Sequence, residues 1–416
     1  MSERVPEGWE IKRLGDYVKL QGGNTFQSSD FRDNGIPIVR ISNIRNDKID
    51  LSDAVYYEKS KVYENFLIAN GDILLAMSGA TTGKIGRYLL PFQSYLNQRV
   101  GRFQKIENKS VCMDFIYQLV RSRVFSENIL IDAVGGAQPN ISSSQVEGIF
   151  YKIPPVPEQK KIASILTSVD EVIETTQKQI DKLQDLKKAT MNELLTKGIG
   201  HTEFKDSELG RIPKSWEVSD IGKLTEFVTS GSRGWSQYYS STGSLFIRIG
   251  NLTRDHINLK FEDIKLVDPP KGGEGTRTRV NLGDILVSIT ADLGIIGVVN
   301  KGVGEAYVNQ HVCLVRLNQK QKVMPRWIGH FLSGHEGQEQ FSKKNDGGAK
   351  AGLNLPTIRS VLVPIPSPDE QHQVVRILDR LDSEINVKQI KLSQTQSLKK
   401  SLMQDLLTGK VRVQVN

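Results

Sequence analysis

The sequence is poor in cysteine and histidine, and it has no long apolar run. Its two cysteines, Cys112 and Cys313, lie far apart in 416 residues, so they predict neither a disulfide framework nor a zinc site and are expected to be reduced and buried. No stretch reaches the roughly eighteen apolar residues that cross a membrane. The Met-Ser-Glu-Arg-Val opening also lacks an apolar signal region. We therefore expect a cytoplasmic protein.

Complete catalytic motifs are also missing. Residues 79–85 (GATTGKI) resemble a P-loop, but they are one residue short between the glycines and end in isoleucine where the magnesium-binding Ser or Thr belongs. The stretch 268–271 (DPPK) has lysine in place of the aromatic residue of amino-methyltransferases, and His335-Glu336 lacks the second histidine of a zinc protease helix. The sequence predicts no catalytic residue, metal or cofactor. Residues 79–85 are instead expected to form either a turn in which Lys84 contacts a phosphate or an ordinary loop.

The composition is that of a folded, mildly basic protein. Apolar residues make up 38% and charged residues 25% of the chain, which is enough for packed cores in two or three domains. The 55 Lys and Arg against 47 Asp and Glu give a net charge of +8. This excess favours a polyanionic partner, although many proteins carry a similar one.

A tandem repeat organises the chain. Seven short blocks of the first half return in the same order in the second half. The paired blocks are 6–10 and 213–217, 39–44 and 247–252, 71–75 and 283–287, 95–98 and 307–310, 135–137 and 347–349, 158–159 and 370–371, and 194–196 and 406–408. From Gly71 onward the offset is constant at 212, and upstream it is 207 to 208; a small insertion near 269–273 explains most of the difference. The chain is a duplication of a unit of about 210 residues.

Each copy is expected to begin with a mixed α/β part of about 155 residues. Strands are predicted at Ile36–Ile41 and Leu245–Ile249, and at Asp72–Met77 and Asp284–Ile289. One helix is predicted late in each copy, with an apolar face at helical spacing: Phe115, Ile116, Leu119 and Val120 in the first, and Trp327, Ile328, Phe331 and Leu332 in the second.

The second part of each copy is predicted to be a long helix that opens after a proline-rich stop. Apolar residues recur at steps of four and three, which is a heptad seam. The predicted spacer seam comprises Ile162, Leu166, Val169, Ile173, Ile180, Leu183 and Leu194, and Val374, Leu378, Leu381, Ile385, Leu392, Leu402 and Leu406. A narrow seam needs a partner helix, and a duplication with pseudo-two-fold symmetry favours an antiparallel coiled coil. The alternative is two separate helices, each packed on its own module.

The predicted fold is α+β: two repeated α/β recognition domains separated by two long helices. The expected boundaries are 1–157 for the first recognition domain, 158–197 for a central spacer helix, 198–212 for a linker, 213–368 for the second recognition domain, 369–410 for a distal spacer helix and 411–416 for a tail. Lys187 and Lys399 share one seam position, where they are expected to fix register or flank the seam.

Two similar modules on a stiff spacer could hold two sites of one polymer at a fixed separation. The strand blocks match between copies, whereas the segments between them differ: 24–35 against 233–243, and 78–94 against 290–306. Such loops on a common frame are expected if each module reads a different short DNA sequence.

The chain resembles the specificity subunit of type I restriction–modification systems. The likeness covers nearly its whole length and rests on the Pro-x-x-Trp-Glu opening of each half, the Gly-Asp-Ile-Leu and Asn-Gln blocks, the Pro-x-x-Glu-Gln entry to each helix and the Leu-Leu-Thr exit. The resemblance implies that each module is a target-recognition domain reading half of a bipartite, asymmetric site, and that the coiled coil sets the gap. It also implies two adenine-methyltransferase subunits and two ATP-dependent restriction subunits as partners, and no catalytic residues in this chain.

The candidate DNA contacts are polar or aromatic residues of the variable loops. They are Asn24, Gln27, Arg45, Thr81, Thr82, Lys84, Arg87, Gln98, Arg99 and Gln138 in the first module, and Arg233, Trp235, Gln237, Tyr238, Arg254, Arg277, Arg279, Gln310, Lys343 and Lys350 in the second. Any of them could instead be an ordinary surface residue, and Gln98 and Gln310 recur in a shared block that favours a framework role equally. Trp9 and Trp216 are expected in the cores. A protein-binding scaffold is the alternative function.

Overall fold

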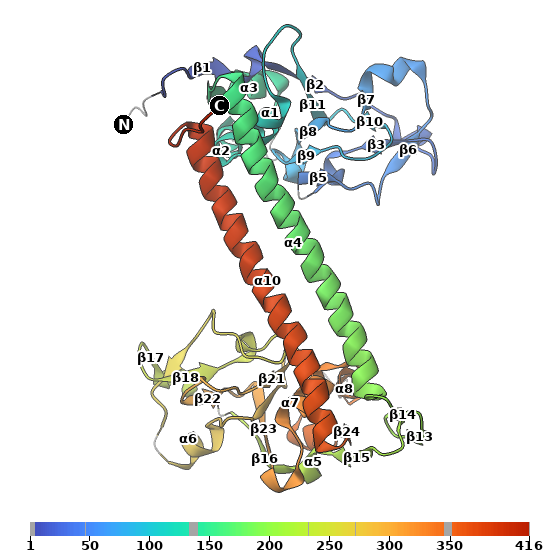
Figure 1. Cartoon of the computed structure of the whole chain (residues 1–416), viewed down its shortest axis with the longest axis vertical. Helices are drawn as coiled ribbons and strands as arrows, with labels where there is room; N and C mark the ends of the chain where they lie inside the picture. Colours follow the sequence, from blue (N-terminus) through green and yellow to red (C-terminus); the bar gives the residue numbers. More distant parts are fainter. Residues whose placement is uncertain are drawn as a thin grey trace. The chain divides into compact units, whose positions relative to one another are not determined.

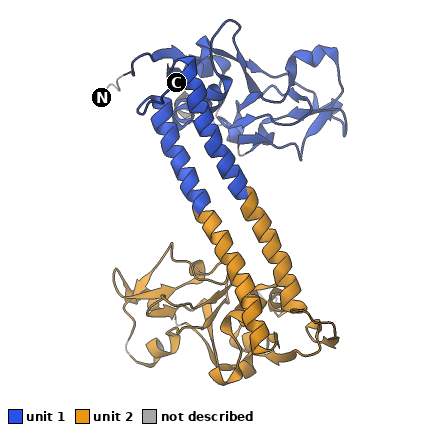
Figure 2. Cartoon of the chain, in the orientation of Figure 1, with its two compact units in different colours: residues 1–177, 391–416 blue, residues 178–390 orange. Residues whose placement is uncertain are grey.

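The computed structural model describes residues 5–45, 47–132, 140–231, 233–270, 272–344 and 352–415. The chain divides into two compact units, residues 1–177 with 391–416 and residues 178–390 (Figures 1 and 2). Each unit contains one copy of the mixed α/β module and parts of both long helices. Figure 2 shows both helices changing from one unit to the other near their middles.

The first unit is built on three sheets. Strands β1 and β12 form an antiparallel pair, a four-stranded sheet has the order β6-β3-β10-β7, and a six-stranded sheet has the order β2-β11-β8-β9-β5-β4. The strands are β1 Glu10–Arg13, β2 Val18–Gly22, β3 Ile36–Val39, β4 Ile44–Arg45, β5 Asp47–Ile49, β6 Val55–Tyr57, β7 Leu67–Ile68, β8 Ile73–Ala76, β9 Ile85–Arg87, β10 Ser94–Leu96, β11 Val100–Lys105 and β12 Phe150–Ile153.

The second unit repeats this plan. Strands β15 and β24 pair as β1 and β12 do, β16-β23-β20-β21 corresponds to β2-β11-β8-β9, and β17-β19-β18-β22 to the other sheet; β18 and β22 are parallel, as β3 and β10 are. A hairpin, β13-β14, precedes the module. The strands are β13 Phe204–Ser207, β14 Gly210–Pro213, β15 Glu217–Asp220, β16 Thr225–Ser230, β17 Tyr239–Ser240, β18 Ser244–Ile247, β19 Leu266–Val267, β20 Ile285–Ser288, β21 Ile296–Val298, β22 Ala306–Val308 and β23 Val312–Leu317, with β24 at Leu362–Ile365.

The predicted strands are present but shorter. β3 and β18 stop before Ile41 and Ile249, which instead open 3-10 turns. The cause is a buried asparagine in each turn, Asn43 or Asn251. Its side-chain oxygen accepts the backbone N–H of Arg40 at 2.9 Å, or of Arg248 at 2.9 Å, and so offers the backbone a local partner that ends the strand.

Three helices, not one, follow the sheets of each module. The predicted apolar faces lie on α1 and α7, but the expectation of a single late helix was wrong because the next helices are short and less amphipathic. The helices are α1 Met113–Val120, α2 Arg123–Asp132 and α3 Ser143–Gly148 in the first unit, and α7 Pro325–Ser333, α8 His335–Lys343 and α9 Leu355–Arg359 in the second. Two further short helices, α5 Ile221–Leu224 and α6 Gly273–Thr278, lie in the second module.

The two long helices are α4 Val156–Thr196 and α10 Pro368–Thr408, and they pack antiparallel. Contacts within the second unit show the direction. Gln179 meets Lys388 at 2.7 Å, and Lys187 meets Asp382 at 2.5 Å, so numbers rise along α4 as they fall along α10. The predicted antiparallel helix pair is therefore confirmed. Each helix begins slightly earlier than expected, and α10 starts at Pro368 itself, a residue that suits a first helical turn.

The ends of the long helices belong to the module cores. In the first unit Ile162, Leu166, Leu406 and Leu407 join the main apolar core. In the second unit Leu195, Val374, Val375 and Leu378 do the same. Each core is thus closed by the start of one long helix and the end of the other.

A glutamate at the start of each long helix, buried at Glu158 and largely covered at Glu370, binds the opening of its module. The indole N–H of Trp9 donates to Glu158 at 3.1 Å, and that of Trp216 donates to Glu370 at 3.0 Å. Both tryptophans are buried, as predicted from the repeated Pro-x-x-Trp-Glu block. This bond explains why the Trp block and the Glu-Gln block recur together.

The segment that follows each long helix supplies the second partner of these glutamates. After α10, Arg412 donates to Glu158 at 2.9 Å; after α4, His201 lies 2.8 Å from Glu370. Gly409 and Gly198 make the turns that bring these segments in, with φ of 75° and 66°. A Cβ at Gly198 would lie 2.6 Å from the ring of Trp216, so glycine is required both by its backbone angle and by space.

The glutamine beside each glutamate satisfies two backbone groups. Gln371 accepts the N–H of Met324 at 2.8 Å and donates to the carbonyl of Pro366 at 3.0 Å. Gln159 does the same for Cys112, at 2.8 Å, and Pro154, at 2.8 Å. These side chains tie the helix start to α7 or α1.

Both cysteines are free thiols. Cys313 is buried, which raises the pKa of its thiol to about 12, so it stays protonated at neutral pH. Cys112 is only half-buried because it precedes the first turn of α1, which corrects the expectation that both are buried. Among the described residues, no helix has the length and apolarity needed to cross a membrane.

Replacing the fully buried Gln371 should destabilise the second unit. In Gln371→Ala two buried backbone groups lose their partners, each worth about 1–3 kcal/mol, so we expect a loss of about 2–4 kcal/mol in the free energy of unfolding. Urea unfolding followed by circular dichroism measures it. Gln159→Ala should behave alike, whereas the exposed neighbour His372→Ala should change stability by less than about 0.5 kcal/mol. A loss below about 1 kcal/mol for Gln371→Ala would contradict this account.

Candidate nucleic-acid interface

Two of the candidate residues in the first module meet at the end of β2. The peptide N–H of Gln98 donates to the carbonyl of Asn24 at 2.8 Å, although the residues lie far apart in the sequence. The hydroxyl of Thr25 donates to the side-chain oxygen Oε1 of Gln98 at 2.5 Å. The side chain of Gln98 is exposed, and its two amide N–H donors have no partner among the described residues.

The matching glutamine of the second module is held by a different group. Gln310 Nε2 lies 3.0 Å from His311 Nε2, and His311 Nδ1 lies 2.7 Å from the hydroxyl of Thr290. The amide nitrogen can only donate, so Nε2 of His311 accepts and its Nδ1–H donates to the hydroxyl of Thr290. Gln310 therefore keeps its carbonyl oxygen and one N–H for other partners. The same residue type presents different groups in the two modules.

Several candidate cations already have partners within the chain. Arg45 pairs with Asp50 at 3.1 Å and Asp53 at 2.9 Å, and Arg254 donates to Gln338 at 3.0 Å and pairs with Asp292. The remaining engaged residues are Arg87 with Asp114 at 2.8 Å, Arg277 with Thr229 at 2.5 Å, Arg279 with Glu305 at 4.0 Å and Lys343 with Glu339 at 2.8 Å. A direct contact of these groups with DNA would compete with these pairs.

Other candidates are exposed and available. Lys84, Arg99 and Arg233 have no carboxylate partner among the residues that the structure describes, and Gln27 and Gln237 are exposed loop residues. Tyr238 is half-buried. Gln138 and Lys350 lie outside the described residues. The exposed cations are therefore the strongest candidates for phosphate contacts.

The turn that resembles a P-loop begins as a 3-10 turn at Gly79–Thr81. The hydroxyl of Thr82 donates back to the carbonyl of Gly79 at 2.7 Å, and the buried Thr81 hydroxyl has no partner among the described residues. Lys84 is exposed and lines a cavity with Asp47 and Arg121. Thr81 and Thr82 thus belong to the framework of the turn, while the charged side chain of Lys84 is exposed at the protein surface.

Trp235 is a core residue of the second module. Its side chain is 2% exposed and its ring stacks on Phe246 at 5.4 Å between centroids, with Tyr238 and Tyr307 around it. A base could stack on this indole only if the aromatic cluster opened. This cluster instead supports the exposed side chains of the same loop, such as Arg233 and Gln237.

Every predicted seam residue is buried or half-buried. Those near the helix ends pack in the module cores, and the others lie along the central part of the pair. The core members are Ile162, Leu166, Leu194, Val374, Leu378, Leu402 and Leu406, and the central ones are Val169, Ile173, Ile180, Leu183, Leu381, Ile385 and Leu392.

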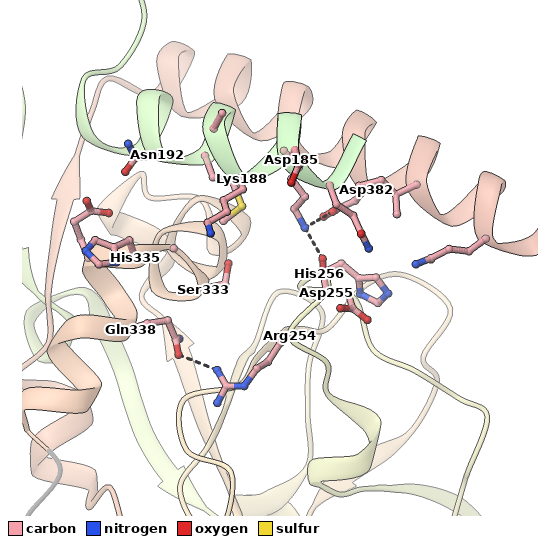
Figure 3. A pocket seen from close by; sticks show the side chains of 18 residues that line it. Asp185, Lys188, Asn192, Arg254, Asp255, His256, Ser333, His335, Gln338 and Asp382 are labelled. Carbon is pink, nitrogen blue, oxygen red and sulfur yellow. Dashed lines mark hydrogen bonds and ion pairs between the residues drawn. The ribbon is translucent and has the colours of Figure 1, made fainter. Parts of the chain in front are cut away.

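A cavity in the second unit has a volume of about 850 Å³ (Figure 3). Its walls come from α4 with Lys188 and Asn192, from the loop Arg254–His256, and from Ser333–Gln338. Figure 3 shows the Arg254–Gln338 hydrogen bond on one wall and Asp382 near Asp255 on another. The lining mixes both charges, and its arginine is already paired.

A cluster beside this cavity has the residue types of a metal site. The ligand atoms of His330, Asp379 and Asp382 lie within 4.8 Å of one another. However, Arg326 pairs with Asp379 at 2.5 Å and Lys187 with Asp382 at 2.5 Å, so both carboxylates are neutralised. Burial lowers the pKa of His330, which keeps it neutral beside Asp379 at 2.9 Å. These residues fit a structural ion-pair network better than a bound cation.

A family model described as the type I restriction modification DNA specificity domain matches residues 6–185 and 213–394. The chain belongs to this family. It is a non-catalytic specificity subunit, consistent with the lack of complete catalytic motifs in its sequence. The two matched segments correspond to the two copies of the repeat.

Relatives share this organisation over their length. The type I restriction enzyme MjaVIII specificity subunit of Methanocaldococcus jannaschii is 27% identical over 99% of this chain and 94% of its own. The EcoKI specificity subunit of Escherichia coli K12 is 24% identical over 91% of this chain and 83% of its own. A crystal structure of an S subunit from M. genitalium covers 98% of both chains with a TM-score of 0.63 at 14% identity, which shows a shared fold.

Sequence reasoning missed Thr25 and His311, the residues that orient the two glutamines. Each lies beside a candidate, but its role depends on a contact across two loops or on a ring tautomer. The only signal in the sequence was that these positions differ between copies, with Arg99 in the first module where His311 stands in the second.

The substitution Trp235→Ala should lower the stability of the second module, and any loss of DNA binding should follow from that loss of stability. The loss of a buried aromatic ring costs about 3–5 kcal/mol, so we expect a lower melting temperature and faster hydrogen exchange in β18 and β22. The exposed neighbour Gln237→Ala is the control and should leave both unchanged. A variant of normal stability that loses only DNA binding would show that Trp235 contacts DNA instead.

Proposed function

We propose that this specificity subunit reads a bipartite, asymmetric DNA site, one half with each module, and that the α4–α10 pair sets the gap between the halves. The main support is the combination of one repeated scaffold with different polar groups on its loops. Gln98 keeps both amide N–H donors, whereas Gln310 uses one of its donors on His311. Base edges in the major groove differ in this pattern of donors and acceptors.

Charge and exposure support a DNA partner. The net charge is +8, and exposed cations without carboxylate partners among the described residues occur in the variable loops of both modules, as at Lys84 and Arg233. Such cations release counterions from DNA and position the protein on its backbone. The arginines that already pair within the chain, such as Arg45 and Arg254, would serve the loops themselves.

The proposed partners are two adenine-methyltransferase subunits and two ATP-dependent restriction subunits. The chain supplies no complete catalytic motif, so modification and cleavage require other subunits. A solved structure described as a basis of complex assembly and conformational transition of a type I system has the same fold, with a TM-score of 0.56 over 98% of this chain. In this proposal the chain directs those subunits to one target.

Methylation mapping tests this function directly. Expressed together with the adenine-methyltransferase subunit of its own type I system, the chain should produce methylated adenines within one motif: two defined stretches separated by a constant, unspecified gap. Sequencing that detects modified bases measures it, and cells with the methyltransferase alone are the control. A continuous motif, or methylation that does not depend on this chain, would refute the proposal. If the chain were a scaffold that binds only proteins, methylation would not depend on it.

Lys84→Ala should weaken DNA binding for all sequences alike. If Lys84 contacts a phosphate, the slope of log affinity against log salt should fall by about one unit. Fluorescence anisotropy at several salt concentrations measures it. Lys223→Ala is a matched control because Lys223 already pairs with Asp220 at 2.9 Å. A loss confined to one base pair of the target would identify Lys84 as a base reader and contradict the phosphate role.

A further inference from the structure

A lysine and an aspartate occur twice at the same positions of the long helices. Asp170 and Lys187 of α4 return 212 residues later as Asp382 and Lys399 of α10. They pair crosswise between the helices: Lys187 lies 2.5 Å from Asp382 in the second unit, and Lys399 lies 2.5 Å from Asp170 in the first. The duplication has therefore kept both halves of two equivalent ion pairs.

These pairs are removed from water. The side chain of Lys187 is 11% exposed and that of Asp382 is 3% exposed, and the other pair is also largely covered. A buried charge that loses its partner is costly, so only one alignment of the two helices is compatible with both pairs. Lysines at seam positions are known to select one register in this way.

Each pair is also bonded to the module of its own unit. The ammonium of Lys187 donates to the backbone carbonyl of Asp255 at 2.5 Å. In the first unit Asp170 accepts from Arg121 at 2.8 Å, and Arg121 also pairs with Asp47. Asp47 and Asp255 occupy equivalent places in the repeat, 208 residues apart. Although burial alone would raise it, the bonds and charges of Arg121 and Lys399 hold the pKa of Asp170 below its usual value, so the junction is charged at neutral pH.

The two junctions separate two kinds of helix residue. All long-helix residues that pack in the main module cores lie outside them, such as Leu166, Leu195, Leu378 and Leu406. Between the junctions, at 171–186 of α4 and 383–398 of α10, apolar residues such as Ile180 and Ile385 are buried without joining either module core. The central segment contributes nothing to either main core, and it bonds to a module through the ion pair of Glu174 with Lys48, at 2.7 Å between partly exposed side chains.

We propose that the Lys187–Asp382 and Lys399–Asp170 junctions, and not the helix ends, define the working length of the spacer. Lys187, Asp382, Asp170 and Lys399 are thus positioning residues for the gap between the half-sites. This inference rests on the proposed function. The seventeen positions from Asp170 to Lys187 rise by about 25 Å, which is the length that would count.

The first test removes one junction while keeping the helix pair. Lys187→Met with Asp382→Met replaces a buried ion pair by apolar side chains, which folded proteins tolerate. The chain in complex with its methyltransferase would be assayed on duplexes that carry the mapped half-sites with gaps from two base pairs shorter to four longer. We expect the preference for the native gap over its neighbours to fall about tenfold, with both half-site preferences kept.

The control for this test is Lys388→Met. Lys388 bonds to Gln179 across the helices at 2.7 Å, and among the described residues it makes no hydrogen bond or ion pair with a module. It should leave gap preference unchanged. If the folded double variant retains the wild-type gap preference, or loses half-site recognition instead, the inference is wrong.

The second test lengthens the central segment. One heptad inserted after Gln177 and another after Gln389 keep the phase of the seam and add about 10 Å between the junctions. The preferred gap should lengthen by about three base pairs, since base pairs rise about 3.4 Å. An unchanged gap would overturn the inference. If the wild-type complex shows no gap preference, it is the proposed function that fails, so the two failures are distinguishable.

Discussion

The burial of a carboxylate at the start of each long helix is the constraint on which this structure depends. Glu158 is buried and the side chain of Glu370 is only 11% exposed, so each must be met by donors. The donors come from two directions: a tryptophan that opens the module, and a cation or imidazole from the segment after the other long helix. One residue thus joins the opening of a module, the start of one helix and the exit of the other. This explains why blocks so distant in the sequence recur together.

The duplication has preserved side chains that satisfy the backbone and has varied those that face solvent. Asn43 and Asn251 accept the same peptide N–H, and Gln159 and Gln371 bridge the same two backbone groups. A buried peptide group without a partner destabilises any fold, whatever the protein binds. The stability of each module therefore requires the same asparagine and glutamine in both copies. The partners of Gln98 and Gln310 carry no such constraint. Variation at such positions changes what a module presents without changing its frame.

The large features followed from the sequence because they depend on periodicity. Heptad spacing gave the helix pair, and matched blocks gave the two modules. Local bonds were harder to foresee: β3 ends early because Asn43 offers its own oxygen to the backbone. Tertiary contacts were hardest. Nothing in the pattern of the loop at 233–243 shows that Trp235 stacks on Phe246, or that Arg254 meets Asp292, since the partners come from other strands and loops. The composition of a loop therefore does not show which of its side chains are exposed and which are buried.

The long helices have two roles: their ends complete the module cores, and their middles act as the proposed spacer. Their ends are fixed by large apolar cores, where any insertion would displace residues such as Leu195 or Leu166. The apolar residues of their middles, such as Ile180 and Ile385, are buried outside the main module cores, against the facing helix. A helix pair held by heptad contacts alone remains stable when whole heptads are added or removed, because each turn buries the same kind of surface. The buried Lys–Asp pairs lie at the boundaries between the core-packed helix ends and the central segment. They supply the register that apolar contacts, which tolerate sliding by a heptad, do not specify by themselves.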